Sequence, residues 1–166
     1  MVSVPVLSTI GYEGSTQDAV LDTLAASGIA LLIDVRAVAA SRKPGLSKRL
    51  LAASLAERGI GYLHLQGLGT PKEGRLAVRA GHPARMRAIY AAHMEGDRPR
   101  AELARAVDEA RRASCCLLCF EHDHRTCHRA ILADLIAAET GQVIRHLAAD
   151  ERPQPPACST RNRAAR

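Results

Sequence analysis

Short runs of apolar residues alternate along this chain with longer segments in which apolar side chains recur at helical spacing. Such alternation is typical of β–α units that build a parallel sheet. Residues 29–35 form an apolar run without polar alternation, which predicts a strand buried on both faces. The five predicted strands are residues 4–10, 29–35, 61–65, 115–120 and 143–147.

The segments between these strands predict helices. Ser15, Ser47 and Thr126 each precede such a segment and are expected to be N-cap residues, because their hydroxyl groups accept hydrogen bonds from free backbone N–H groups. The predicted helices are residues 15–28, the segment that follows Ser47, and residues 84–94, 100–113 and 126–139. The fold class predicted is α/β, with three layers, a mostly parallel five-stranded sheet and helices on both of its faces, in a Rossmann-like arrangement.

Residues 66–83 show little periodicity and contain much glycine, proline and charge. A loop of this length is unusual in a compact domain and is often a binding loop. The chain length of 166 residues fits one domain, which we expect to span residues 1–150. Residues 151–166 are predicted to form a disordered basic tail.

Composition and charge indicate which classes of binding partner to expect. The formal net charge of +6 favours anionic partners, but half of it falls in residues 151–166, where four arginines accompany a single glutamate. The remaining domain is mildly basic, and aromatic residues make up only 2% of the chain, so duplex binding and base stacking are weakly supported. A small anionic ligand is therefore the expected partner, with nucleic acid a weaker alternative.

The cellular compartment is predicted from what the sequence lacks. No apolar run of about 18 residues and no signal-peptide pattern is present, so we expect no membrane contact and a cytoplasmic location. The five cysteines are odd in number and clustered, which favours free thiols in a reducing compartment.

Polar residues follow the predicted strands, at the edge where ligands bind in sheets of this type. Glu13 and Glu121 are the candidate general acids or bases, and basic side chains are expected to hold the anion, Arg36, Arg42 and Arg129 foremost. The candidate ligand-binding residues are Tyr12, Arg36, Arg42, Lys43, His64, Lys72 and Arg129.

Cys127 is a third candidate catalytic residue. Behind an N-cap at Thr126 it would lie in the first turn of a helix, where the helix dipole lowers the pKa of a thiol. The alternative is that Cys127 packs inward as a small buried side chain. A further interpretation is the Cys119-x5-Arg125 spacing, which resembles the anion loop of rhodaneses and cysteine phosphatases, although carboxylates at Glu121 and Asp123 within the loop would repel a phosphate.

A metal site is another interpretation of the same stretch. The stretch contains two cysteines and three histidines within ten residues, and thiolate with imidazole suits zinc or iron; these residues are Cys119, His122, His124, Cys127 and His128. The candidate ligands are Cys119, Cys127 and His128. The spacing matches no familiar zinc-finger pattern, so such a site would also need His64 or a carboxylate such as Glu13 or Glu121. Imidazoles clustered on a surface loop are more often simply solvated.

Six motifs in order resemble the domain-of-unknown-function family 488. They are Thr9-Ile10-Gly11-Tyr12-Glu13-Gly14, Asp34-Val35-Arg36, Ser41-Arg42-Lys43-Pro44-Gly45-Leu46-Ser47-Lys48, Tyr62-Leu63-His64-Leu65, Leu68-Gly69-Thr70-Pro71-Lys72-Glu73, and Cys119-Phe120-Glu121 with Cys127-His128-Arg129. The resemblance implies a small α/β domain of the bacterial or archaeal cytosol and brings no settled reaction with it.

Three hypotheses follow. The first is an enzyme that acts on a small anionic, phosphorylated or nucleotide-like substrate. The second is a metal-dependent site that contains zinc or iron. The third is a non-catalytic module that binds nucleic acid or protein through its basic loops and tail.

Overall fold

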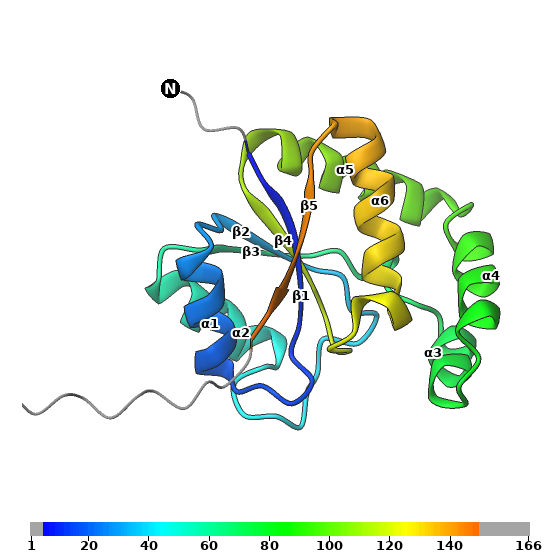
Figure 1. The fold of residues 1–166 in the computed structure, drawn as a ribbon, viewed down its shortest axis with the longest axis horizontal. Coiled ribbons are helices and arrows are strands. Elements are labelled where there is room, and N and C mark those ends of the chain that lie inside the picture. Colours follow the sequence, from blue (N-terminus) through cyan, green and yellow to red (C-terminus); the bar gives the residue numbers. More distant parts are fainter. Residues whose placement is uncertain (1–4, 150–166) are drawn as a thin grey trace, which may run out of the picture.

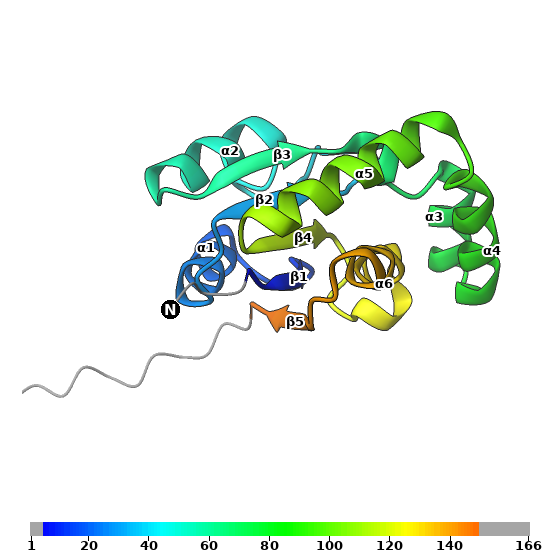
Figure 2. The same ribbon diagram turned by 90° about the horizontal axis from the view of Figure 1, so that it is seen from above.

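The computed structural model describes residues 5–149, so the predicted tail at 151–166 lies outside the described residues. Five strands form one sheet in which every pairing is parallel (Figure 1), and Figure 2 shows their order, β3-β2-β4-β1-β5. The strands are β1 (Leu7–Gly11), β2 (Leu31–Asp34), β3 (Gly61–His64), β4 (Cys115–Cys119) and β5 (Ile144–Ala148). The predicted fold class is confirmed.

Helices cover both faces of the sheet. Helices α1 (Gln17–Ala26) and α2 (Lys48–Glu57) lie on one face, and α5 (Asp97–Arg112) and α6 (His128–Thr140) lie on the other (Figures 1 and 2). Their buried side chains recur every three or four residues, as expected for helices with one apolar face. The result is a helix–sheet–helix arrangement with a core on each side of the sheet.

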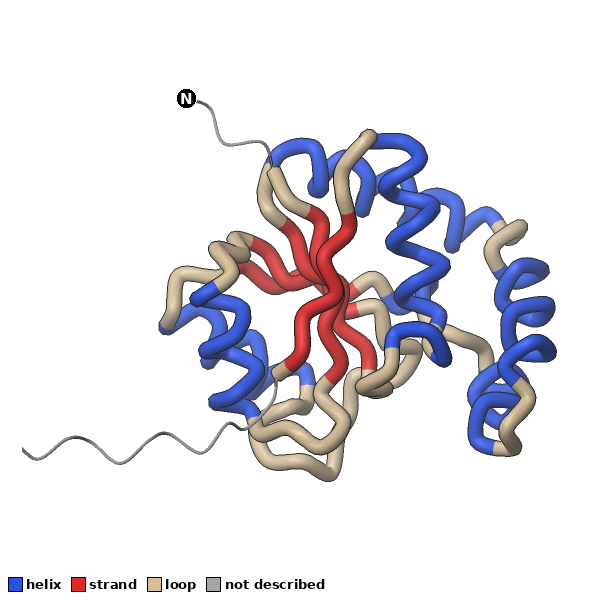
Figure 3. Tube along the Cα trace, viewed as in Figure 1, coloured by secondary structure: helices blue, strands red, loops and turns tan. Residues whose placement is uncertain are grey.

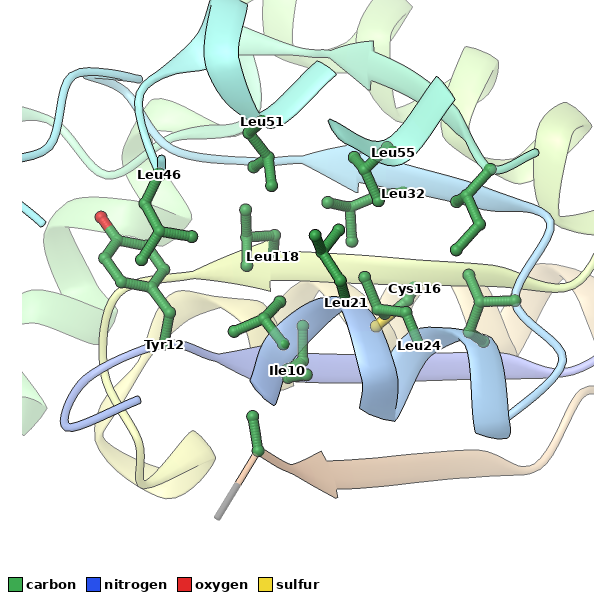
Figure 4. Close-up of a cluster of buried hydrophobic side chains, with 14 residues drawn as sticks. Ile10, Tyr12, Leu21, Leu24, Leu32, Leu46, Leu51, Leu55, Cys116 and Leu118 are labelled. Carbon is green, nitrogen blue, oxygen red and sulfur yellow. The ribbon is translucent and has the colours of Figure 1, made fainter. Parts of the chain in front are cut away.

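The core beneath α1 and α2 is built almost entirely from aliphatic side chains. Figure 4 shows Leu21 and Leu24 of α1 and Leu51 and Leu55 of α2 converging on the sheet. Tyr12 closes this core at the carboxyl edge of the sheet. Because the sequence has so few aromatic residues, this core is filled by closely packed branched aliphatic side chains.

Two of the three expected N-caps are shifted by one residue. Thr16, not Ser15, caps α1, because the Ser15 hydroxyl donates to the carbonyl of Ala149 at 2.5 Å. Cys127, not Thr126, is the N-cap of α6, since Thr126 ends a 3-10 turn (η2, His124–Thr126) that precedes the helix. Ser47 does occupy the N-cap position of α2, but its hydroxyl bonds to Ser41 rather than to the helix.

The prediction of a loop over residues 66–83 is wrong for residues 72–79, which form a helix. A 3-10 turn (η1, Gln66–Leu68) is followed by α3 (Lys72–Arg79), which pairs with α4 (Pro83–His93) as a helical hairpin beyond the sheet. The sequence of α3 is charged and carries Gly74 in its interior, so its helical signal is weak. Packing on α4 stabilises it: Gly74 faces that helix, where a Cβ atom would lie 3.6 Å from Ile89 and 3.7 Å from Met86.

A hydrogen bond from α4 ties this hairpin to the rest of the molecule. The buried hydroxyl of Tyr90 donates to the carbonyl oxygen of Leu68 at 2.8 Å. We expect Tyr90→Phe to lower the free energy of unfolding by about 1–2 kcal/mol, because the carbonyl is left without its donor. Urea unfolding followed by circular dichroism measures this, and an unchanged midpoint would show that the bond contributes nothing.

The carboxyl ends of the strands meet at one edge, where loops gather beneath the sheet in Figure 3. Strand β4 lies between β1 and β2, which brings the loops that follow these three strands together. The contact is close at Gly11, where a Cβ atom would lie only 1.8 Å from the carbonyl oxygen of Glu121. No helix within residues 5–149 has the length and apolarity needed to cross a membrane.

Candidate functional site

A cleft of about 620 Å³ opens at this edge of the sheet. Loops after β1, β2 and β4 and helix α3 contribute its walls. The polar and aromatic lining residues are Tyr12, Glu13, Arg36, Ser41, Arg42, Lys43, Thr70, Arg75, Arg79, Cys119, Phe120, Glu121 and His128. Side chains that are far apart in the sequence therefore share one cavity.

Four basic side chains line this cleft beside Arg36: Arg42, Lys43, Arg75 and Arg79. Within residues 5–149, none of these four forms a salt bridge with a carboxylate. Lys43 Nζ donates to the carbonyl of Ser15 at 3.0 Å, and Arg75 Nη1 donates to that of Thr70 at 2.8 Å. These bonds orient the two cations without neutralising them, so the cleft carries an excess of positive charge.

Arg36 is held differently. Its guanidinium forms a bidentate salt bridge with the buried Asp34, with Nη2 2.6 Å from Oδ2 and Nε 2.8 Å from Oδ1. Its Nη1 donates to the hydroxyl of Tyr12 at 3.1 Å and to the carbonyl of Leu46 at 2.9 Å. Most of its donors are therefore engaged within the protein, and Arg36 shapes the wall of the cleft.

Arg129 is almost fully buried, at 1% exposure. Its guanidinium donates to the carbonyl oxygens of Glu121 and His122 and to the hydroxyl of Thr9. The side chain thus connects α6 to β1 and to the loop after β4. The structure places it behind the cleft wall, in a position that supports Glu121.

The remaining predicted ligand-binding residues lie outside the cleft. The ring of His64 bonds through Nε2 to the carbonyl of Arg36 at 2.9 Å, and Lys72 is exposed at the start of α3.

The two carboxylates of the cleft differ in their exposure to solvent. Glu13 is exposed and accepts from the backbone N–H of His122 at 3.0 Å, whereas Glu121 is half-buried among the thiols.

Two thiols and an imidazole form a compact cluster at the floor of the cleft. The Nδ1 atom of His128 lies 3.7 Å from Sγ of Cys119 and 3.6 Å from Sγ of Cys127. The other ring nitrogen, Nε2, is 2.9 Å from the carbonyl oxygen of Val35. A carbonyl oxygen only accepts, so Nε2 carries the proton and the lone pair of Nδ1 in the neutral ring faces both sulfur atoms. Cys119 also donates to Glu121 Oε2 at 2.8 Å.

The pKa values of the two thiols in this cluster are shifted in opposite directions. Burial raises the pKa of Cys119, and its neighbours Cys127 and Glu121 raise it further. Burial also opposes ionisation of Cys127, but its neighbours Cys119, His128 and Arg129 together lower its pKa well below the usual range. Burial by itself would lower the pKa of His128. The charge of Cys127 outweighs this effect, so the pKa is raised above its ordinary value. Burial raises the pKa of Glu121, and the charge of Cys127 adds to this.

The position of Cys127 limits its chemistry. Its Sγ accepts a hydrogen bond from the backbone N–H of Arg129 at 3.5 Å, as an N-cap does, and its side chain does not line the cleft. Cys119 lines the cleft, but burial and its neighbours raise the pKa of its thiol. The thiol whose pKa is lowered therefore lies beneath the surface that a substrate would reach, which disfavours a nucleophilic role for Cys127.

The Cys-x5-Arg interpretation needs the guanidinium of Arg125 beside Cys119. The structure instead exposes 79% of the Arg125 side chain and pairs it with Asp123 at 2.9 Å. The two ends of this motif are not brought together around an anion site.

A comparison with known protein families supports the resemblance found in the sequence. The family model described as domain of unknown function DUF488 matches residues 16–136. The chain belongs to this family. No curated protein and no solved structure matches it. The DUF488 match covers the segments that form the walls after β2 and β4 as well as α3, so most of the cleft of this DUF488 chain lies within the family domain.

Several cleft residues were not predicted. Arg75 and Arg79 come from α3, and Phe120 presents a ring that is 44% exposed and packs edge-on against Tyr12, with centroids 5.4 Å apart. The spacing of four between Arg75 and Arg79 was a usable signal, since it puts both on one face once the segment is helical. The signal was hidden by the interpretation of residues 66–83 as a loop.

Proposed function

We propose that this DUF488 chain is an enzyme that acts on a small anionic ligand, phosphorylated or nucleotide-like, bound in the cleft. The observation that carries the proposal is the set of basic side chains, Arg42, Lys43, Arg75 and Arg79, that line the cleft without a carboxylate partner in residues 5–149. Cations gathered in this way repel one another and are stabilised by an anion between them.

Size and shape support a ligand of nucleotide class. A volume of about 620 Å³ falls within the range of small-molecule sites. Guanidinium groups bind phosphate through paired hydrogen bonds, and three of the four cations are arginines. The exposed ring of Phe120 and the exposed side chain of Val38 add an apolar surface to the same cleft, on which a planar base can stack.

The floor of the cleft supports a chemical role beyond binding. Cys119, Glu121 and His128 line it, and a buried thiol and imidazole beside a half-buried carboxylate cost stability that a simple binding pocket does not require. Glu121, half-buried and held by the loop that Arg129 supports, is the carboxylate we assign to proton transfer with the ligand, and Glu13 stands at the exposed end of the cleft.

Replacing Arg79 tests the anion site. We expect Arg79→Gln to weaken binding of pyrophosphate and of adenosine monophosphate about tenfold or more, since one charged hydrogen-bonding contact is lost. Isothermal titration calorimetry measures both affinities. The matched control is Arg105→Gln, which removes the same charge from an exposed position of α5 outside the cleft.

Equal affinities in Arg79→Gln and Arg105→Gln would overturn the assignment of the cleft. Binding of a short oligonucleotide that weakens steeply with salt, together with no binding of either small anion, would favour the nucleic-acid module instead.

A further inference from the structure

We infer that Cys119, Cys127 and His128 hold a divalent metal ion of the zinc type at the floor of the cleft, with the fourth coordination position open to the cleft. The inference deepens the proposed function, because the metal would lie beside the bound anion. It does not require that function, since the donor set stands on its own geometry.

The distances within the cluster suit a tetrahedral metal. With zinc–sulfur bonds of about 2.3 Å and zinc–nitrogen bonds of about 2.1 Å, the sulfur-to-nitrogen edge of a tetrahedron is about 3.6 Å. The two edges from His128 Nδ1 to the sulfur atoms of Cys119 and Cys127 measure 3.7 and 3.6 Å. The donor atoms of all three residues lie within 4.8 Å of one another. Both sulfur-to-nitrogen edges of the cluster therefore match those of a tetrahedral zinc site.

The surroundings of the donors are those of a ligand set. A histidine that binds a metal usually donates its other ring N–H to a fixed acceptor, which sets the tautomer. His128 does so with the carbonyl of Val35 at 2.9 Å. The backbone N–H of Arg129 donates to Cys127 Sγ, which supports negative charge on that sulfur. Rigid elements present all three donors, Cys119 at the end of β4 and the other two at the start of α6.

The donor types select the kind of metal. Two thiolates and an imidazole favour zinc over magnesium or calcium, which prefer oxygen ligands. The competing fate of the same two sulfur atoms is a Cys119–Cys127 disulfide, which would release two electrons to an oxidant and leave no thiolate for a metal. A reducing compartment favours the metal.

The fourth coordination position would face the cleft, because two of the three ligands lie at the cleft surface. Cys119 and His128 line the cleft, whereas Cys127 lies beneath it. Glu121 lines the cleft as well, and its Oε2 is 2.8 Å from Cys119 Sγ. Three protein ligands with one free position is the pattern of catalytic rather than structural zinc. Water or an oxygen atom of the bound anion can occupy that position beside Glu121.

Metal content is the direct test. Full-length protein, freed of any histidine tag and purified under reduction, is equilibrated with buffered zinc, dialysed and analysed by mass spectrometry for metals. We expect one zinc per chain in the wild type and about a tenfold or greater loss of zinc affinity in Cys127→Ser and in Cys119→Ser. Cobalt substitution should give the intense visible absorption of a tetrahedral thiolate site.

Cys116→Ala is the matched control, because Cys116 is a fully buried cysteine of β4 outside the cluster. It should keep the zinc affinity of the wild type. Circular dichroism establishes that each variant is folded, and the wild-type stoichiometry stays decisive if a serine variant does not fold. Wild-type zinc far below one per chain, or a cobalt spectrum without thiolate bands, would overturn the inference.

The outcome is separable from that of the proposed function. Pyrophosphate affinity is measured for zinc-loaded and metal-free wild type. Tighter binding in the loaded form supports a metal that faces the anion. Zinc binding with equal pyrophosphate affinities would contradict the open position at the cleft, and pyrophosphate binding without zinc uptake would remove the metal and keep the anion site.

Discussion

Replacing Asp34 by Asn is expected to lower the free energy of unfolding by about 3–5 kcal/mol, because the substitution leaves the Arg36 guanidinium buried without a counter-charge. Asp34 is completely buried and Arg36 is 5% exposed. The carboxylate accepts two side-chain hydrogen bonds from Arg36 and one from the hydroxyl of Tyr62 at 2.5 Å. Burial raises the pKa of Tyr62, and its hydrogen bond to Asp34 raises it further, so the hydroxyl stays a donor.

Urea unfolding monitored by circular dichroism measures the change, and a double variant supplies the control. In Asp34→Leu with Arg36→Met both charges are gone, so the loss of stability should be much smaller than in Asp34→Asn. A single variant within about 1 kcal/mol of the wild type would mean that water reaches Arg36. Because Arg36 also holds Tyr12 and the carbonyl of Leu46, we expect Asp34→Asn to weaken pyrophosphate binding as well.

Replacing Gly11 by Ala is expected to destabilise the protein by about 3 kcal/mol or more and to disrupt the floor of the cleft. A Cβ atom there would lie 1.8 Å from the carbonyl oxygen of Glu121 and 3.0 Å from Nη1 of Arg129, which donates to that same carbonyl. The loop after β4 must move away from β1 to relieve the clash. Glu121 moves with it, so ligand binding should fall together with stability.

Gly61→Ala is the matched control for this prediction. Gly61 also lies in a strand, at the start of β3. A Cβ atom there would have a flexible side-chain atom of Leu31 as its nearest neighbour, at 3.1 Å. We expect a change below about 1 kcal/mol there. Equal thermal midpoints for Gly11→Ala and Gly61→Ala would show that the loop after β4 yields easily and does not hold the cleft in shape.

The sheet was predictable because its signal is local. Apolar runs such as residues 29–35 and 115–120 stand out in the sequence, and the alternation with helical segments leaves few topologies other than a parallel sheet. Helix α3 was not predictable in this way. Its interior Gly74 and its charged residues lower its intrinsic helicity, and its stability depends on α4, which only the folded chain places beside it.

The candidate site was predictable in part for the same reason. Residues that follow strands, such as Glu13, Arg42 and Glu121, do line one cleft. Arg129 was indistinguishable from them in the sequence, yet its guanidinium is buried against backbone carbonyls. The direction of a side chain near a helix start depends on where the helix begins, and the 3-10 turn before α6 shifted that start by one residue.

The sequence by itself determined the layers of this protein, the edge of the sheet at which polar groups collect and the family to which the chain belongs. Those properties follow from periodicity and from the order of short motifs. Only the tertiary structure decided which cations of the cleft have no carboxylate partner among the described residues, and that Cys119, Cys127 and His128 face one another. Such properties depend on side-chain directions and on contacts between segments distant in sequence, which the folded chain alone sets.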